Sequence, residues 1–370
     1  MPERAREVVE YRKSGLSLNH IQGCPLDCAY CIRHTYGLWD QRVPRALMSD
    51  AEAVEALVNH RYFQPHVTPV QVFNRATDPF LPVVRPHTFA VLEDLDARNL
   101  TNHVLVITRH QMKAADVDRL ERLRHIKVTL LFTYSGIDNR QIEPYPSRVA
   151  AESLKLMSNP LNRRYRTVLY WRPLVPGLND SPEHLDAAYE LSKHADTTVF
   201  TGLFYRDQIA EYYQANGLPE PYGETARRKI VPETLERRIL STFAGSDSLF
   251  RKTSCAVSFA HGDPDYNGHY GIPDLCDICL LAQLDLCRGA HRVPTRQQIH
   301  QVASTLPDAS DLVVVDITEG AAVVSGLIEE QPRYYLQHAL GFQVHDVRHP
   351  HLNRRHGRAD IGWKDGTDNG

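Results

Sequence analysis

Three cysteines near the N-terminus follow the spacing C-x3-C-x2-C, with a tyrosine directly before the last of them. Cys24, Cys28 and Cys31 supply three thiolates, and thiolates are the ligands that hold iron–sulfur clusters. A four-iron cluster held by three thiolates keeps one iron open to a small molecule. Zinc is the alternative, because Zn²⁺ also takes cysteine ligands and His34 offers a fourth. Spacings of four and three residues also suit one face of a helix.

The other four cysteines form a second group with the spacing C-x20-C-x2-C-x7-C. They are Cys255, Cys276, Cys279 and Cys287. Four ligands from a glycine-punctuated segment suit a closed tetrahedral thiolate site, which zinc and a fully ligated [4Fe–4S] cluster both satisfy. Spacing does not separate the two. Three plus four uses all seven cysteines of the chain.

The bulk composition sets limits on the class of protein. The chain has 370 residues, 42% of them hydrophobic, and a net charge of -3, which argues against a basic nucleic-acid coat over the whole surface. No secretory signal and no apolar run of roughly 18 residues is visible, so we expect a soluble, cytoplasmic protein in which thiols stay reduced. The motifs of P-loop, zinc-protease and serine-hydrolase sites are missing from the sequence.

Short β-rich runs alternate with amphipathic helical stretches over the first 250 residues. The expected strands are Ser17–Ile21, Val70–Phe73, His103–Ile107, Lys127–Phe132, Thr167–Trp171 and Thr198–Phe204. Ser49 with Glu52 predicts a capping box, and Ser181 before Pro182 predicts a second helix start. The pattern predicts an α/β protein, a partial (β/α)6 TIM-like barrel of parallel strands with chemistry at their carboxyl ends.

The expected organisation has three parts. Residues 1–250 form the barrel, 251–295 a small metal-binding segment, and 296–370 a small α/β unit ending in a basic, His/Arg-rich tail. Within the last part we expect a helix near Thr295–Ser304, an extended run at Asp311–Ile317 and a helix near Arg333–Ala339.

The segment Cys24-x3-Cys28-x-Tyr30-Cys31, on a loop after the first strand of a six-stranded βα repeat, resembles the radical S-adenosylmethionine (SAM) superfamily. The resemblance covers roughly residues 15–250. It implies a [4Fe–4S] cluster on the three cysteines, with SAM chelating the open iron. It also implies reductive cleavage of SAM to a 5'-deoxyadenosyl radical that abstracts hydrogen from a substrate.

The same resemblance implies a set of SAM contacts at the strand ends, although the usual Gly-Gly-Glu after the second strand is absent. Thr77-Asp78-Pro79 is similar instead to the spore photoproduct lyase-like branch. Arg109 and Glu143 are the residues we expect to be catalytic. The expected cofactor-binding residues are Tyr30, Asn74, Thr77, Asp78, Thr108, Arg109, Ser135, Glu143, Arg148, Pro176 and Asn179. The resemblance favours iron in the second cysteine group, as an auxiliary [4Fe–4S] cluster, with zinc as the alternative.

The spore photoproduct lyases use a free cysteine as hydrogen donor. If both cysteine groups bind clusters, no cysteine remains here for that role, so hydrogen return falls to a tyrosine or to deoxyadenosine. The expected substrate is a nucleoside, a nucleotide or another natural-product intermediate, and the expected reductant is a flavodoxin or ferredoxin. The alternatives are a nucleic-acid repair or modification enzyme and a non-enzymatic two-site zinc protein that binds nucleic acid.

Three further segments allow two interpretations each. The stretch Phe204 to Pro232 is a lid or a surface connection. The polar and aromatic residues between His261 and Tyr270 bind a hydroxyl-rich substrate or bond their own backbone. The basic residues from His345 to Arg358 contact phosphates or form a solvated end.

Overall fold

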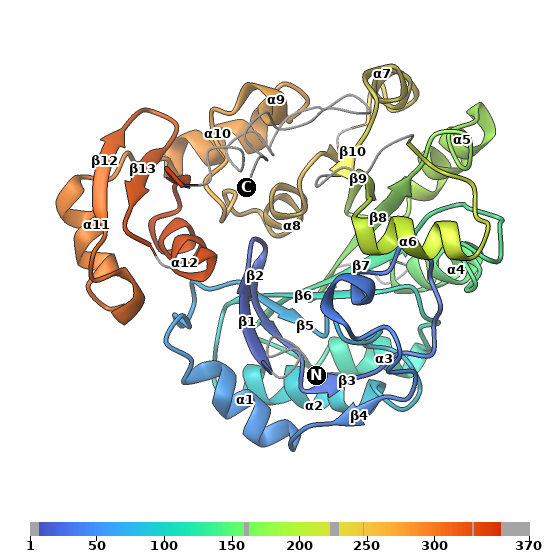
Figure 1. The fold of residues 1–370 in the computed structure, drawn as a ribbon, viewed down its shortest axis with the longest axis horizontal. Coiled ribbons are helices and arrows are strands. Elements are labelled where there is room, and N and C mark those ends of the chain that lie inside the picture. The colour runs from blue at the N-terminus through green and yellow to red at the C-terminus, as the bar shows by residue number, and fades with distance from the viewer. Residues whose placement is uncertain (1–6, 159–162, 223–228, 247, 328, 349–370) are drawn as a thin grey trace.

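The computed structural model describes residues 7–158, 163–222, 229–246, 248–327 and 329–348. Six parallel strands form the centre of its main sheet, in the same order as in the chain (Figure 1). They are β2 (Gly15–Leu18), β5 (Val70–Val72), β6 (His103–Thr108), β7 (Lys127–Tyr134), β8 (Arg166–Leu174) and β9 (Thr197–Phe204). The partial (β/α)6 barrel is therefore confirmed, as an open sheet.

The two edges of this sheet are short strands that the sequence did not predict. β1 (Val9–Arg12) pairs antiparallel with β2, and β10 (Lys229–Ile230) pairs antiparallel with β9. β11 (Leu249–Phe250) also pairs with β9, in the parallel sense. In the pairings of the described residues the edge strands do not meet, so the sheet stays open.

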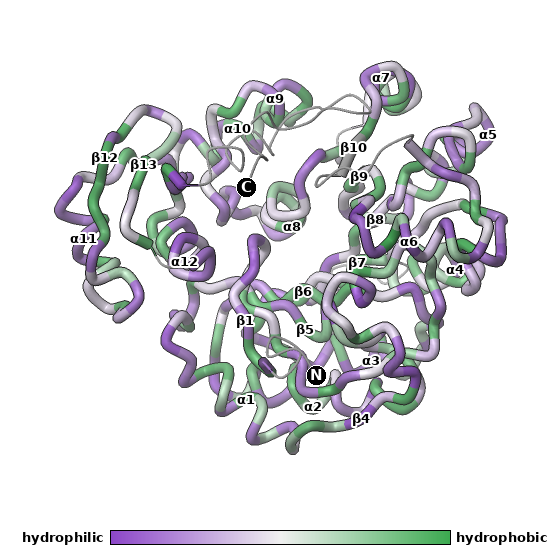
Figure 2. The backbone as a smooth tube through the Cα atoms, viewed as in Figure 1, coloured by the Kyte–Doolittle hydropathy of each residue, from purple (hydrophilic) through white to green (hydrophobic). Residues whose placement is uncertain are grey.

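The helices that connect the parallel strands cover the outer face of the sheet. They are α1 (Asp50–Val58), α2 (Arg85–Ala97), α3 (Ala114–Leu120), α4 (Ser147–Ser158) and α5 (Pro182–Ser192). The capping box of Ser49 with Glu52 is confirmed, and Ser181 caps α5 with proline at the first helical position. Figure 2 shows hydrophilic and hydrophobic residues mixed along α1 and α4, because one face of each helix packs on the sheet.

The inner face of the sheet is covered by a helix from the second cysteine group. Leu105, Leu131 and Val168 of the strands pack with Ala256 and Val257 of α8 (Thr253–His261). Figure 1 shows α8 lying within the arc of the strands. The first cysteine of the second group thus belongs to a helix that completes the core of the barrel.

Two stretches differ from the sequence expectation. The first strand ends at Leu18, and Ile21–Gln22 instead form β3, which pairs antiparallel with β4 (Arg45–Ala46). The stretch after Phe204 contains α6 (Asp207–Ala215), which buries Ile209 and Tyr213. Neither feature shows the long apolar period by which sequence reasoning detects an element.

The C-terminal part contains a separate three-stranded sheet in the order β12 (Val313–Ile317), β13 (Ala322–Ser325) and β14 (Val344–Asp346). Its predicted helices are present as α11 (Arg296–Ala303) and α12 (Glu330–Leu340), and its predicted extended run is present as β12. The remaining elements are η2 (Ile32–Tyr36), α7 (Glu233–Thr242), α9 (Pro273–Cys276), α10 (Leu281–Ala290) and η3 (Pro307–Ala309). Most of the basic tail, residues 349–358, lies outside the described residues. Among the helices of the described ranges, none is long and apolar enough to cross a membrane.

Candidate metal and cofactor site

The first cysteine loop begins just after β3 and is fixed by backbone contacts. Gly23 has φ +108, and a Cβ there would meet the Val43 carbonyl oxygen at 2.3 Å, so only glycine fits this approach. The Cys24 N–H donates to the Gln41 oxygen at 2.9 Å. The guanidinium of Arg33, which is fully buried, donates to the carbonyl oxygens of Leu26 (2.7 Å) and Gln41 (3.1 Å). Arg33 therefore holds the two sides of the loop together.

The three thiols of this loop are close enough to influence one another. Cys24 and Cys28 are buried and Cys31 is half-buried. Burial raises the pKa of Cys24, and the nearby Cys31 raises it further, although Arg33 opposes the shift. Burial also raises the pKa of Cys28 well above its usual value. A thiol with a raised pKa loses its proton readily only when a cation, such as a metal ion, binds to the sulfur.

A buried ionic network lies directly beside Cys28. Its thiol is 3.9 Å from Glu143 Oε1, and Arg109 Nη1 contacts the same oxygen at 2.7 Å. Arg109 Nη1 also donates to the Tyr30 hydroxyl at 2.7 Å, and this hydroxyl donates to Glu143 Oε2. Ser135 donates to Glu143 Oε2 at 3.0 Å. Four of the residues that the sequence analysis assigned to the cofactor site are thus in contact, around one carboxylate.

A second set of contacts joins the ends of β5 and β6. Asp78 accepts from the Thr108 hydroxyl at 2.7 Å and from the Arg109 N–H at 2.9 Å. These bonds fix the backbone of Arg109 and so aim its guanidinium toward Tyr30. The hydroxyl oxygen of the neighbouring Thr77 is buried and has no hydrogen-bond partner among the described residues.

The other predicted cofactor residues lie around this network in different roles. The side-chain amide of Asn74 contacts Ser17 at 2.5 Å and Gln71 at 2.8 Å. Asn179 donates to the Ser135 carbonyl oxygen at 2.6 Å, which ties the turn after β8, with Pro176, to the end of β7. Arg148 is exposed near the start of α4.

His34, the fourth ligand that zinc would need, packs in an aromatic stack. Its ring lies 3.7 Å from that of Trp39, nearly parallel to it, and 4.6 Å from that of Tyr212 on α6. Burial lowers the pKa of His34 to about 4, with Arg33 adding to the shift. The imidazole is therefore neutral and is held by ring contacts between η2 and α6.

The second cysteine group spans α8, α9 and α10. Burial raises the pKa of Cys255 well above its usual value and that of Cys279 to about 12, and neighbouring thiols add to both shifts. Cys287 Sγ accepts from the Asp265 N–H at 3.4 Å and from Gln283 Nε2 at 3.5 Å. The ligand atoms of Cys255, Asp265 and His269 lie within 4.8 Å of one another. The arrangement offers thiols, N–H groups that can orient sulfur, and a histidine–carboxylate pair.

The polar segment that includes this pair bonds mainly to other parts of the protein. Asp263 contacts Lys127 Nζ at 2.6 Å and His103 Nε2 at 3.1 Å. Asn267 accepts from Gln337 Nε2 at 3.0 Å on α12. These contacts hold the segment against the amino ends of the strands and against the C-terminal unit.

Sequence reasoning missed one cluster of metal-ligand type. His20, Asp50 and His87 have ligand atoms within 4.8 Å of one another. Their separation in the chain, 30 and 37 residues, carries no motif. Arg33 was missed as well, because a single arginine beside the cysteine loop has no distinguishing spacing. Its neighbour His34 drew attention instead, since histidine is a common metal ligand.

Comparison with known proteins gives structural matches only. No protein-family model matches the chain, and no curated protein matches it by sequence. The crystal structure of Streptococcus suis SuiB bound to S-adenosylmethionine matches with 12% identity and a TM-score of 0.44, over 69% of this chain and 54% of SuiB. Spore photoproduct lyase complexed with dinucleoside spore photoproduct matches with 13% identity and a TM-score of 0.45, over 66% of this chain and 79% of the lyase. The chain thus spans about half the length of SuiB, and similarity at this level assigns no function.

Proposed function

We propose that this protein is a radical SAM enzyme. The observation that carries the proposal is the placement of three neighbouring thiols, on a loop at the carboxyl edge of six parallel strands, beside the buried Arg109–Glu143 pair. A [4Fe–4S] cluster bound there would supply the electron for reductive cleavage of SAM, and the 5'-deoxyadenosyl radical so formed would take a hydrogen atom from the substrate. Cys24, Cys28 and Cys31 are the residues that would hold the cluster.

The chemistry of the donor set fits this group. Burial raises the pKa of Cys24 and of Cys28, so negative charge on these sulfurs would need a bound cation to balance it. The unpartnered hydroxyl of Thr77, in the described part of the chain, supports a polar ligand at the end of β5.

Arg109 is the residue that we propose pairs with the carboxylate of SAM. Its side-chain contacts with Tyr30 and Glu143 both use Nη1. A guanidinium offers five N–H donors in a fixed fork, so the other donors can face a carboxylate. Glu143 then balances the charge of Arg109 and fixes its direction, while Tyr30 joins both to the cysteine loop.

We propose that the second cysteine group holds an auxiliary [4Fe–4S] cluster, with zinc as the alternative. The N–H groups of Asp265 and Gln283 that face Cys287 Sγ support a metal-bound thiolate, because such hydrogen bonds stabilise charge on sulfur. With seven cysteines used, hydrogen return would require a tyrosine or deoxyadenosine. Tyr205 and Tyr213 are the candidates, because they pack in the same apolar cluster as the tyrosine of the first cysteine loop.

The proposed substrate is a nucleoside, a nucleotide or another natural-product intermediate, with a flavodoxin or ferredoxin as reductant. A nucleic-acid repair or modification enzyme is the second candidate. Binding to DNA or RNA that weakens steeply with salt would favour the second candidate, since phosphate contacts release counterions.

The deciding experiment is anaerobic incubation of the iron- and sulfide-loaded protein with SAM and dithionite, followed by measurement of 5'-deoxyadenosine. We expect the wild type to form it and Cys28→Ala to form none. Cys287→Ala is the matched control, because it removes a thiol of the second group and should keep SAM cleavage. Full deoxyadenosine formation by Cys28→Ala would refute the proposal.

Metal analysis of the same three proteins tests the two centres separately. We expect about eight irons per wild-type chain, since each [4Fe–4S] cluster holds about four. About four irons with one zinc would make the second centre a zinc site and leave the first unchanged. A colourless protein that contains zinc alone, prepared without oxygen, would favour the non-enzymatic zinc protein.

A further inference from the structure

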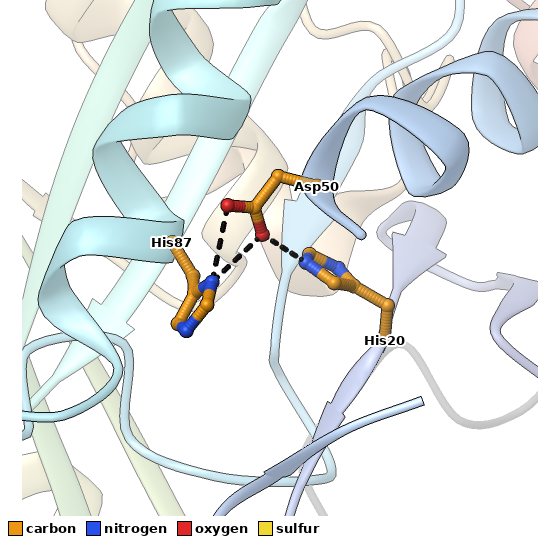
Figure 3. A group of neighbouring side chains, drawn as sticks. All are labelled: His20, Asp50 and His87. Atoms are coloured by element: carbon orange, nitrogen blue, oxygen red, sulfur yellow. Dashed lines mark hydrogen bonds and ion pairs between the residues drawn. The ribbon is translucent and has the colours of Figure 1, made fainter. Parts of the chain in front are cut away.

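A second kind of metal-ligand set lies outside both cysteine groups. His20 follows β2, Asp50 is the first residue of α1, and His87 lies in the first turn of α2. Figure 3 shows both imidazoles directed at the Asp50 carboxylate from opposite sides. His20 Nε2 is 2.7 Å from Oδ1, and His87 Nδ1 is 2.9 Å from Oδ1 and 3.0 Å from Oδ2. One nitrogen of each ring thus contacts the same carboxylate, and the three ligand atoms lie within 4.8 Å of one another.

Asp50 is not required for capping of its own helix. At the start of α1 the Ser49 hydroxyl accepts from the Glu52 N–H, and the Glu52 carboxylate accepts from the Ser49 N–H at 2.9 Å. Aspartate at this position usually serves the helix end, but here the capping box does so. The Asp50 carboxylate is therefore directed to the two histidines.

The charge of this carboxylate faces histidines rather than a permanent cation. In the part of the chain that the structure describes, His20 and His87 each contact the Asp50 carboxylate through one ring nitrogen. The side chain of His20 is fully buried, and its Nε2 faces the Asp50 carboxylate at 2.7 Å. Neutral imidazole is the form of histidine that binds metal ions.

The three side chains differ in their exposure to solvent. The side chain of His20 is fully buried, whereas those of Asp50 and His87 are 27% and 36% exposed. An ion from solvent can therefore reach the carboxylate, and water can occupy the coordination positions that the protein does not fill. Two histidines and one carboxylate with open positions form a recurring set for divalent ions of the first transition row.

We propose that His20, Asp50 and His87 bind one divalent transition-metal ion, separate from the cysteine sites. The ion joins the segment between β2 and β3 to the starts of α1 and α2. His20 lies four residues before Cys24, and its carbonyl oxygen accepts from the Leu47 N–H at 2.8 Å. The ion would thus fix the segment that leads into the first cysteine loop.

Zinc binding to the iron- and sulfide-loaded protein tests this proposal. Wild type, Asp50→Asn and His87→Ala are dialysed against Zn²⁺ and then against metal-free buffer, and zinc per chain is measured by elemental analysis. We expect the wild type to retain one zinc more than either variant. His125→Ala, which removes an exposed histidine elsewhere, is the control and should match the wild type. Equal zinc in all four proteins would overturn the proposal.

Two features keep this test independent of the cysteines and of folding. All four proteins contain the seven cysteines, so any zinc bound to thiolate cancels in the comparison. X-ray absorption of the additional zinc should show ligands at about 2.0–2.1 Å, as for nitrogen and oxygen, and sulfur distances of about 2.3 Å would contradict the site. Asp50→Asn keeps the size of the side chain, and equal iron content shows that each variant is folded.

Discussion

The buried pair of Arg109 and Glu143 leads to a strong prediction for Glu143→Gln. This change keeps the shape of the side chain but removes its charge. The Glu143 side chain is 3% exposed and that of Arg109 is 16% exposed, with 2.7 Å between Oε1 and Nη1. The variant therefore leaves a guanidinium in a mostly buried position without its counter-charge.

The expected loss follows from burial. Removing one partner of a buried ion pair costs about 3–5 kcal/mol of the free energy of unfolding, because the other charge stays desolvated. Glu93→Gln is the matched control, since Glu93 Oε1 contacts Arg119 Nη2 at 2.6 Å but the two side chains are 47% and 35% exposed. An exposed pair of this kind contributes about 0.2–1 kcal/mol.

Urea unfolding of the wild type and both variants, in the same metal-free state, measures the difference. For a slope of about 3 kcal/mol per molar urea, a difference of about 3 kcal/mol separates the two variant midpoints by about 1 M. Equal midpoints for Glu143→Gln and Glu93→Gln would refute the reasoning. They would show that the network beside Cys28 does not stabilise the cysteine loop.

Two other variants test the loop itself. Burial lowers the pKa of His34 to about 4, so between about pH 6.5 and pH 4 the unfolded chain binds more protons than the folded one. The wild type therefore loses stability as the pH falls through this range. His34→Gln should make the stability depend less on pH there. Urea midpoints at about pH 7 and about pH 5 measure this, and an unchanged difference would contradict it. Gly23→Ala should destabilise more than Gly177→Ala: at Gly23 the new Cβ meets the Val43 oxygen at 2.3 Å, whereas Gly177, with φ +77, has no described atom within 4 Å of it. The positive φ alone costs each alanine variant about 1–2 kcal/mol, and the contact with Val43 adds to this cost only at position 23. Equal midpoints for the two variants would show that the loop moves to relieve that contact.

The order of elements in the barrel could be predicted from sequence because each parallel strand is a short apolar run between helical patterns. The runs at His103–Ile107 and Lys127–Phe132 lie within β6 and β7. The short edge strand β1 has no such run, and its pairing with β2 depends on a neighbour in space. α6 was missed because a nine-residue helix with two adjacent tyrosines shows only a short apolar period.

The sequence could predict that the site lies at the ends of the parallel strands, but it could not predict which side chains contact one another there. Residues after neighbouring parallel strands meet at one edge, which is why Arg109 and Ser135 were expected near the cysteine loop. That both join through Glu143 depends on the path of the loop after β7. The metal-ligand cluster around Asp50 shows the same limit, because only the packing of α1 and α2 brings its members together.

The position of α8 has a consequence for how the protein is made. The ribosome delivers β6 to β9 first, with Leu105, Leu131 and Val168 on a face that α8 covers, and α8 begins at Thr253. A nascent chain therefore keeps this apolar face open until α8 has been synthesised, a state prone to aggregation. Folding of the barrel and placement of the second cysteine group are therefore coupled, since the helix that covers the inner face of the sheet also bears Cys255.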